Sequence, residues 1–454
     1  MRNRCFLLTA ALVASLIVHA QAKVWTLDDC IEYAISHNID IRQKGVQIQK
    51  QEVALNTSRN EWLPTVSADF AEQLSFANAD ATSGTTDDLA YTTGSITASI
   101  NLFDGMKVRN SILADRFSLQ AATSDIQNAR KQTSIQVAIQ YLQCLYQRSI
   151  IIEAQEQLAL SRQMVKRANI RYEEGQRPLS ELKDIEAQAA HDEYTLVNAQ
   201  GQYTLALTQL SQLLNLPSAE GFDIADIDEE SETPPVIYDQ AVSSVCCGQV
   251  VSSVYCGTAA ISSVVDNWPS IIAAKARIES GKANIKVARA NLYPTLSLQS
   301  HTGTSYLNSL HHDPDWGSFG SQFFHKNWNE VIGLHLYVPI FNRFQTRNKI
   351  RAAKLDVLDQ ELALEDAQQK LRQDIQTAQT NVNVARQKFQ AAKKAAEAAA
   401  ISLSFEQESF DAGRSSVFDL LQARQKHTQA RQETIQAKYE LIIRQRILKF
   451  YLTP

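Results

Sequence analysis

The chain has 454 residues, with 44 Lys and Arg against 49 Asp and Glu, which gives a formal net charge of −5. This weakly acidic balance offers no electrostatic footprint for nucleic-acid binding. Only 15 Gly and 10 Pro are present, a low usage that agrees with long helices.

Residues 1–22 have the pattern of a cleaved secretory signal peptide. Arg2 and Arg4 supply a positive end, 6–18 form a short apolar run, and 20–22 form a small-x-small cleavage site. The alternative is an N-terminal membrane anchor, for which the apolar run is short. No later stretch approaches the length of about 18 continuous apolar residues that a transmembrane helix needs. The pattern therefore predicts an exported mature chain.

The mature chain is predicted to open with a helix from Leu27 to about Trp62. Thr26 suits the N-cap of this helix and acidic residues follow in its first turn. Pro64 stops the helix because the residue before a proline is driven out of the helical region.

Two stretches with apolar residues at every second position follow, and they predict a hairpin of strands about 10 to 12 residues long. The apolar face would carry Val66, Ala68, Phe70, Leu74 and Phe76 from the first strand and Ile96, Ala98, Ile100 and Leu102 from the second. Glu72 interrupts this face, and the opposite face is rich in hydroxyl groups. A soluble sheet can show the same pattern. The small, hydratable side chains on the polar face favour a water-filled membrane barrel.

A proline-free stretch of about 68 residues comes next and predicts one helix about 100 Å long. Asp104 suits its N-cap and Gly175 its C-terminal end. After a turn over 175–178, a further helix is predicted from about Leu179 to Leu214. The first structural repeat therefore spans 23–214.

Residues 215–266 are acidic and then rich in Ser and Val, and they are interpreted as a surface linker between two halves of the chain. Cys246, Cys247 and Cys256 lie in this insert and could include one disulfide in an oxidising compartment. No histidine lies among them, which argues against zinc. The other two cysteines of the mature chain, predicted to be buried apolar groups in helices, are Cys30 and Cys144.

From Asn267 to Pro454 the same plan recurs as a second structural repeat. A helix is predicted to reach Leu292, a third strand begins at Leu296, and 301–329 are predicted to form a long loop. The fourth strand would place on one face Ile332, Leu334, Leu336, Val338 and Ile340. A second long helix is predicted between Asn342, as N-cap, and Gly413. A last helix then runs to about Tyr451.

The second long helix has the clearest periodicity in the chain. Its apolar residues step by four and three, as in a coiled-coil seam, at Leu371, Ile375, Ala378, Val382, Ala385, Phe389, Ala392, Ala396, Ala399 and Leu403. Many of these are alanine, which lets neighbouring helices approach closely. This helix is therefore predicted to pack along its whole length.

Several motifs occur once in each half and in the same order. Leu102-Phe103-Asp104-Gly105 is answered by Ile340-Phe341-Asn342-Arg343, and Tyr172-Glu173-Glu174-Gly175 by Phe410-Asp411-Ala412-Gly413, both at an offset of about 238 residues. Pro64-Thr65 is answered by Pro294-Thr295. With the opening Thr26-Leu27-Asp28-Asp29-Cys30-Ile31, these motifs resemble the TolC-like outer-membrane efflux protein family, the outer membrane factors, over nearly the whole mature chain.

The resemblance implies an α+β membrane protein. Long antiparallel coiled-coil helices would form an α-helical barrel across the periplasm. Each chain would contribute four strands to a 12-stranded transmembrane β-barrel in a homotrimer, in contact with outer-membrane lipid. The protein would be the exit duct of a tripartite efflux or type I secretion system, docked to a periplasmic adaptor and an inner-membrane pump. No cofactor is implied.

The resemblance also assigns roles at the two helical hairpin turns. The constriction of the periplasmic tip would be formed by Glu181, Asp184, Asp419 and Gln422, where glutamine replaces the second acid of the family. Candidates for a contact that keeps the tip closed are Tyr172, Arg177, Phe410 and Arg414. Adaptor docking would use Glu174, Gly175, Gln176, Ala412, Gly413 and Arg414. Without the resemblance, the acids would be read as a solvated helix face with Lys183 as a partner.

No arrangement of nucleophile, base and orienting acid stands out, so no enzyme is predicted. Four residues could bind a metal but are interpreted as exposed loop residues, namely His311, His312, Asp313 and His325. The rival function is a soluble periplasmic coiled-coil structural or adaptor protein with its strands packed in a soluble domain. The burial of the apolar strand residues separates these two functions.

Overall fold

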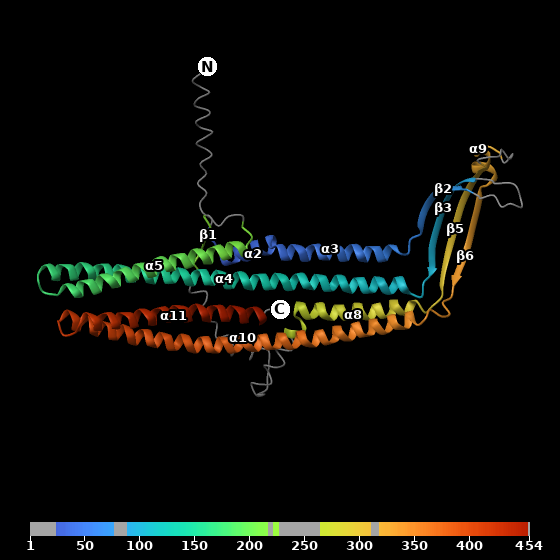
Figure 1. The fold of residues 1–454 in the computed structure, drawn as a ribbon. Helices are drawn as coiled ribbons and strands as arrows, with labels where there is room; N and C mark the ends of the chain where they lie inside the picture. The colour runs from blue at the N-terminus through green and yellow to red at the C-terminus, as the bar shows by residue number, and fades with distance from the viewer. Residues whose placement is uncertain (1–23, 77–88, 217–220, 227–263, 310–316, 453–454) are drawn as a thin grey trace, which may run out of the picture. The chain divides into compact units, whose positions relative to one another are not determined.

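The computed structural model describes residues 24–76, 89–216, 221–226, 264–309 and 317–452 (Figure 1). The predicted signal segment, the three cysteines of the insert, and His311, His312 and Asp313 lie outside these residues. The chain divides into two compact units. A helical unit comprises Met1–Gly45, Ile126–Ile271 and Ala367–Pro454, and a strand-bearing unit comprises Val46–Asp125 and Ile272–Asp366.

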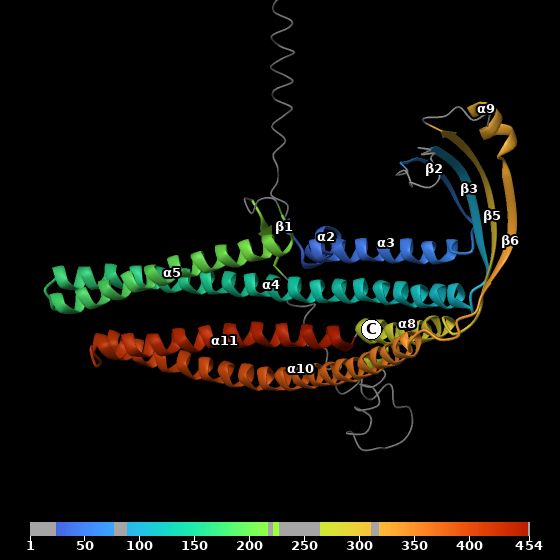
Figure 2. The ribbon, with the colours of Figure 1, turned by 45° about the vertical axis from the view of Figure 1, so that its right-hand side comes forward.

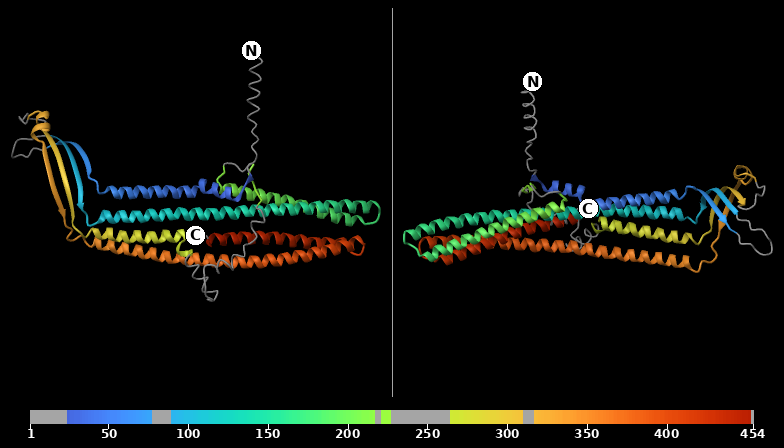
Figure 3. Two further views of the ribbon diagram at one scale, coloured as in Figure 1. Left: turned by 180° about the vertical axis from the view of Figure 1, so that it is seen from behind. Right: turned by 45° about the horizontal axis from the view of Figure 1, so that its top comes forward.

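Each half of the sequence contains one helix of 67 residues, as its proline-free stretch predicts. These helices are α4, Lys107–Glu173, and α10, Gln345–Asp411. Each turns back into a shorter helix, α5, Leu179–Leu213, or α11, Val417–Leu452, and forms a long hairpin with it (Figure 3). The helix that precedes the strands of the second half is α8, Pro269–Ala290.

The prediction of one continuous first helix is wrong, because the helix is broken at Asn38. It consists of α2, Leu27–His37, and α3, Ile39–Asn60. Asn38 has extended backbone angles, and its side-chain Oδ1 accepts hydrogen bonds from the backbone N–H groups of Asp40 at 2.9 Å and Ile41 at 3.3 Å. The side chain of Asn38 thus caps α3, and this capping replaces the continuation of α2 through Asn38. The predicted start is confirmed, since Thr26 and Asp29 form a capping box.

The core of the helical unit lies where α2, α4 and α5 meet a short pair of parallel strands, β1, Val24–Trp25, and β4, Asp223–Ile224. Tyr141 is fully buried there, and its hydroxyl donates to the carbonyl oxygens of Trp25 at 3.1 Å and Ala225 at 2.6 Å. Cys30 and Cys144 are also fully buried and are free thiols. Their predicted role as buried apolar groups is confirmed.

The predicted seam of α10 is confirmed, because all ten of its positions are buried or half-buried. Ala378, Val382 and Ala385 pack in one cluster with Leu441 and Leu448 of α11. Small side chains in this seam allow the two helices of the hairpin to lie close together. Among the residues that the structure describes, no helix combines the length and the apolarity needed to cross a membrane.

The strand-bearing unit contains a four-stranded antiparallel sheet in the order β2-β3-β5-β6 (Figure 2). Its strands are β2, Thr65–Ser75, β3, Leu89–Phe103, β5, Thr295–Ser309, and β6, Asn329–Tyr337. The register aligns Val66 with Ala98, Ala98 with Ser300, and Ser300 with Ile332. The predicted apolar residues of all four strands therefore share one face.

Among the described residues, this apolar face is largely exposed, and only the short helical turns of 319–326 lie over part of it. Val66, Ile96 and Leu334 are 68%, 53% and 67% exposed, and Leu298 is half-buried. A soluble domain would bury such a face, because each large apolar side chain gains about 1.5 to 3 kcal/mol when it leaves water. The exposure therefore argues against the soluble reading and for a face that meets lipid.

The second hairpin of the sheet differs from the prediction at two places. β5 continues to Ser309, so His301 lies in a strand and not in a loop, and 319–326 form short helical turns. Polar residues on both faces of β5 hide its alternation in the sequence. β6 ends at Tyr337, which leaves Val338 and Ile340 beyond the strand.

The turns from strand to long helix are only partly equivalent in the two halves. Asp104 acts as the predicted cap, because its carboxylate accepts from the backbone N–H groups of Lys107 at 3.1 Å and Val108 at 2.8 Å. Asn342 does not cap its helix in this way. Its side-chain amide donates to the Thr346 hydroxyl, and its backbone carbonyl accepts from the Gln345 N–H at 3.1 Å. The N-cap prediction is thus confirmed once and wrong once.

The first of these turns contains a tightly constrained glycine, Gly105. Its φ is +67°, and a Cβ at this position would lie 2.8 Å from the carbonyl oxygen of Ala290. We expect Gly105→Ala to lower the free energy of unfolding by about 2 kcal/mol, through backbone strain and this contact. Thermal unfolding followed by circular dichroism measures the loss. Gly45→Ala is the control, because that glycine is in a helix with open space around it; equal behaviour of the two variants would contradict the prediction.

Candidate functional site

The two hairpin turns of the helical unit end in the same backbone motif. Gly175 and Gly413 have φ values of +71° and +73°. In the first turn, the N–H groups of Gly175 and Gln176 donate to the carbonyls of Tyr172 and Arg171, both at 2.9 Å. In the second turn, the N–H groups of Gly413 and Arg414 donate to the carbonyls of Phe410 and Ser409, at 3.0 and 2.8 Å. These are Schellman motifs, which satisfy the last helical carbonyls and require a left-handed residue.

The two turns contact each other through Phe410, which is 7% exposed. The guanidinium carbons of Arg171 and Arg177 lie 5.8 and 5.4 Å from the centre of its ring. Arg171 also forms an ion pair with Asp411 at 3.6 Å, and Arg177 one with Glu181 at 3.5 Å. Two arginines of the first hairpin therefore hold an aromatic ring of the second. We call this group the tip clasp.

Apolar packing supports the tip clasp from the side of the helices. Phe410 belongs to a buried cluster with Ile185, Val417 and Leu420. Ring burial of this kind contributes more free energy than the exposed ion pairs, which are worth about 1 kcal/mol or less each. The aromatic ring is therefore the main contact between the two turns.

The structure brings together two of the four residues predicted to keep the tip closed. Arg177 and Phe410 are in the tip clasp, whereas Tyr172 and Arg414 are exposed and outside it. Arg171 was not predicted from the sequence; it precedes Tyr172 in the chain and contacts both Phe410 and Asp411. Phe410 has no hydroxyl group, and its contact with the two arginines is a cation–π contact, which needs only the ring face.

The four predicted constriction residues have different surroundings. Glu181 is held in the ion pair with Arg177, and its side chain is only 13% exposed. Asp419 accepts from the Ser416 hydroxyl at 2.6 Å and caps α11 with it. Asp184 and Gln422 are exposed. Among the six predicted docking residues, Gly175 and Gly413 have open space where a Cβ would be added, and all six are exposed.

A buried polar network joins the same two hairpins further from the turns. Arg424 of α11 is 8% exposed and reaches α4, where its guanidinium donates to the Gln157 carbonyl oxygen at 2.6 Å. It also pairs with Asp192 of α5 at 3.3 Å. Asp192 accepts in addition from Ser161 and, at 2.9 Å, from Gln188. One carboxylate is therefore shared by side chains of three helices.

The network continues along α4 with a second pair of charges. Glu153 is 2% exposed, accepts from Gln157 at 3.1 Å and pairs with Arg431 at 2.8 Å. Burial lowers the pKa of Arg424, an effect that Asp192 opposes. Burial, together with the nearby Arg431, also lowers the pKa of His427, an effect that Glu153 opposes. This network was not predicted from the sequence. The available signal was an arginine four residues after Leu420, on the apolar side of α11.

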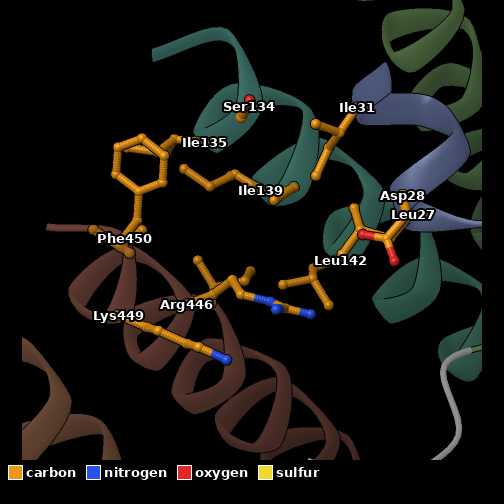
Figure 4. A pocket seen from close by; sticks show the side chains of 13 residues that line it. Leu27, Asp28, Ile31, Ser134, Ile135, Ile139, Leu142, Arg446, Lys449 and Phe450 are labelled. Atoms are coloured by element: carbon orange, nitrogen blue, oxygen red, sulfur yellow. The ribbon is translucent and has the colours of Figure 1, made fainter. Parts of the chain in front are cut away.

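A separate cavity of about 180 Å³ lies between α2, α4 and α11 (Figure 4). Its wall is apolar, with Ile31, Ile139 and Leu142 toward the space, while Arg446 and Lys449 of α11 stand at its edge. It contains no nucleophile paired with a base. Among the described residues, no group of three or more His, Cys, Asp or Glu lies together in a way that suits a metal ion.

The exposed apolar face of a four-stranded sheet and two hairpins of very long helices define a membrane-embedded channel subunit. Comparison with known proteins leads to the same class of protein. The model of the outer membrane efflux protein family matches residues 30–216 and 260–452. The chain belongs to this family and is an outer-membrane efflux protein.

Three relatives of low sequence identity match nearly the full length of this chain. Outer membrane efflux protein BepC of Brucella suis is 22% identical over 440 residues, which are 96% of this chain and 87% of BepC. The outer membrane protein VceC of Vibrio cholerae superposes with a TM-score of 0.75 at 16% identity, covering 94% of this chain and 95% of VceC. The MtrE outer membrane channel of Neisseria gonorrhoeae superposes with a TM-score of 0.74 at 20% identity, covering 94% of this chain and 88% of MtrE.

Proposed function

We propose that three copies of this chain form a passive conduit through which an inner-membrane pump discharges its substrates to the outside. The single observation that carries this proposal is the open sheet. β2 and β6 stand at its two edges, and its apolar face is exposed. Unpaired strand edges are not tolerated in hydrocarbon, so the edges must pair with those of other copies.

The number of copies follows from the space that the strands enclose. Two copies would give eight strands, whose interior is filled by side chains, whereas three would give twelve and leave room for water. The face opposite the apolar one carries Ser67, Thr97, Ser99 and Gln299, which suit a hydrated lumen. A trimer is the smallest assembly that closes the edges and conducts.

The tip is proposed to be the regulated end of this conduit. The tip clasp and the Arg424 network keep the two hairpins of one subunit together, and the two Schellman turns are exposed. A periplasmic adaptor would dock on residues 174–176 and 412–414 and shift the hairpins apart. The energy for transport would come from the pump.

Reconstitution tests the conduit. The protein should require detergent for extraction, migrate as a trimer that heat dissociates, and produce discrete conductance steps in a planar bilayer. Recovery of a monomer from the periplasm without detergent, or the absence of conductance from intact trimers, would contradict the proposal.

Acidic side chains near the tip are proposed to make the conduit cation-selective. Replacing Glu181, Asp184 and Asp419 together with alanine should reduce the preference for cations, because like charges around a threefold axis attract counter-ions. Reversal potentials in a salt gradient measure this preference. Glu52→Ala, at an exposed acid of α3, is the control and should change nothing. Unchanged selectivity in the triple variant would reject the acidic constriction.

A further inference from the structure

The connection from β5 to β6 folds back as two short turns, α9, Phe319–Ser321, and η2, Gln322–Lys326. β6 pairs with β5 only as far as Gly303, so the last part of β5 lacks a strand neighbour on that side. Gln322, 5% exposed, takes this place, accepting from Leu307 N–H at 3.2 Å and donating to Leu307 C=O at 3.0 Å. The side chain of Asn327 likewise donates to Ser305 C=O at 2.7 Å. These bonds fix the turn at the end of the sheet (Figure 2).

The turn lies over the apolar face of the sheet and not over the polar one. The ring of Phe323 is 6.5 Å from that of Phe70. A Cβ added to Gly94, the partner of Phe70 in the register, would lie 2.9 Å from Phe323. Both strand residues belong to the apolar face. A glycine at this position therefore leaves room for the edge of an aromatic ring of the turn against the apolar face.

Several aromatic rings of the turn remain exposed. Phe319 stacks on Phe323 at 4.9 Å, and Phe324 lies 5.3 Å from Phe323. Phe319, Phe324 and Trp328 are 42%, 61% and 51% exposed. The Trp328 Nε1–H donates to Glu330 at 2.9 Å, so the polar end of this indole is satisfied within the chain. We call Phe319, Phe323, Phe324 and Trp328 the aromatic turn.

The aromatic turn stands where polar residues enter the apolar face of the sheet. Val66, Ala68 and Phe70 follow one another along β2, and Glu72, which accepts from Thr92 at 3.1 Å, interrupts this row before Leu74. On β6, Glu330 precedes Ile332 on the same face. Aromatic side chains at such a border favour the boundary between acyl chains and headgroups. Two basic residues, His325 and Lys326, adjoin the rings.

We propose that the aromatic turn is an interfacial lipid anchor. Its rings occupy the boundary between acyl chains and headgroups of the outer leaflet, and Lys326 approaches the phosphate of an anionic lipid. The anchor sets the depth of the sheet in the membrane. Lipid is the occupant because the rings continue the exposed apolar face and carry a basic rim. The inference rests on the proposed function, which places that face in the bilayer.

Trp328 provides a probe of depth in the full-length trimer. The protein is reconstituted in vesicles of phosphatidylcholine and phosphatidylglycerol, brominated either near the headgroup or near the chain end. The difference between wild type and Trp328→Phe reports the fluorescence of Trp328 alone. We expect bromine near the headgroup to quench Trp328 about twofold more than bromine near the chain end. In Phe324→Ser the quenching should fall, whereas the apolar control Phe324→Leu should retain it.

The outcomes separate the anchor from the conduit. If neither brominated lipid quenches Trp328 in protein that still conducts, the turn lies in water and the anchor is refuted, while the proposed function stands. Stronger quenching from the chain end, or equal quenching in Phe324→Ser and Phe324→Leu, also overturns it. Protein that neither inserts nor conducts refutes both proposals.

Discussion

Replacing Arg424 with methionine should loosen the tip more than any other single change in the helical unit. Methionine keeps the length of the side chain but leaves the carboxylate of Asp192, which is 13% exposed, without its guanidinium partner. Breaking a buried pair from one side costs about 3 kcal/mol or more. We expect a lower temperature of thermal unfolding and a larger single-channel conductance in a planar bilayer, because α11 is no longer tied to α4 and α5.

A double variant shows whether the effect comes from the charge pair. Asp192→Leu combined with Arg424→Met removes both charges, and it should recover much of the lost stability because no unpaired charge stays buried. Arg386→Met is the matched control, at an exposed arginine of α10 where a change of about 0.5 kcal/mol or less is expected. If the double variant is as unstable as Arg424→Met, the pair is not the source of the stability.

Replacing Gly175 or Gly413 with asparagine should weaken docking strongly while the fold is kept. Asparagine tolerates the left-handed backbone that both turns require, and its side chain would project into open space. Any loss of binding therefore reports added bulk on the docking surface and not a broken turn. We expect at least about a tenfold loss of adaptor binding, the equivalent of 1.4 kcal/mol.

Photo-crosslinking from position 176 in cells, with mass spectrometry of the captured protein, measures this binding. Gly201→Asn, on α5 and also surrounded by open space, controls for bulk placed elsewhere. Trimer yield and conductance should be unchanged in all three variants. Wild-type crosslinking in the variants at Gly175 and Gly413 would contradict docking at the turns.

The sequence predicted those features that local chemistry determines. Gly175 and Gly413 were placed at helix ends because only glycine adopts the required backbone angles at no cost, and the structure confirms both. The seam of α10 followed from the spacing of its apolar residues. The apolar face of the sheet followed from alternation in β2, β3 and β6. The family was predicted from motifs that occur in both halves and is confirmed by the match of its model.

The missed features depend on single side chains or on partners distant in sequence. The break after α2 is made by one asparagine, which a helix can also accommodate without breaking. The extent of β5 was hidden because Thr302 and Thr304 are polar on its apolar face. Arg424 contacts Gln157 and Asp192, which lie far away along the chain, so no local sequence pattern predicts the network. Two residues of the tip clasp, Arg177 and Phe410, were predicted. Arg171 was not, because nothing in the sequence distinguishes it from the other charged residues near the turn.

The two buried thiols of the helical unit make a reporter of its unfolding. Burial, together with the proximity of Cys30, raises the pKa of Cys144 to about 12. The reactive thiolate is therefore a minute fraction at neutral pH. Alkylating reagents should pass over both residues while the unit is folded and modify them only when it opens. The extent of their modification, measured for each cysteine by mass spectrometry, thus reports how often the unit is open.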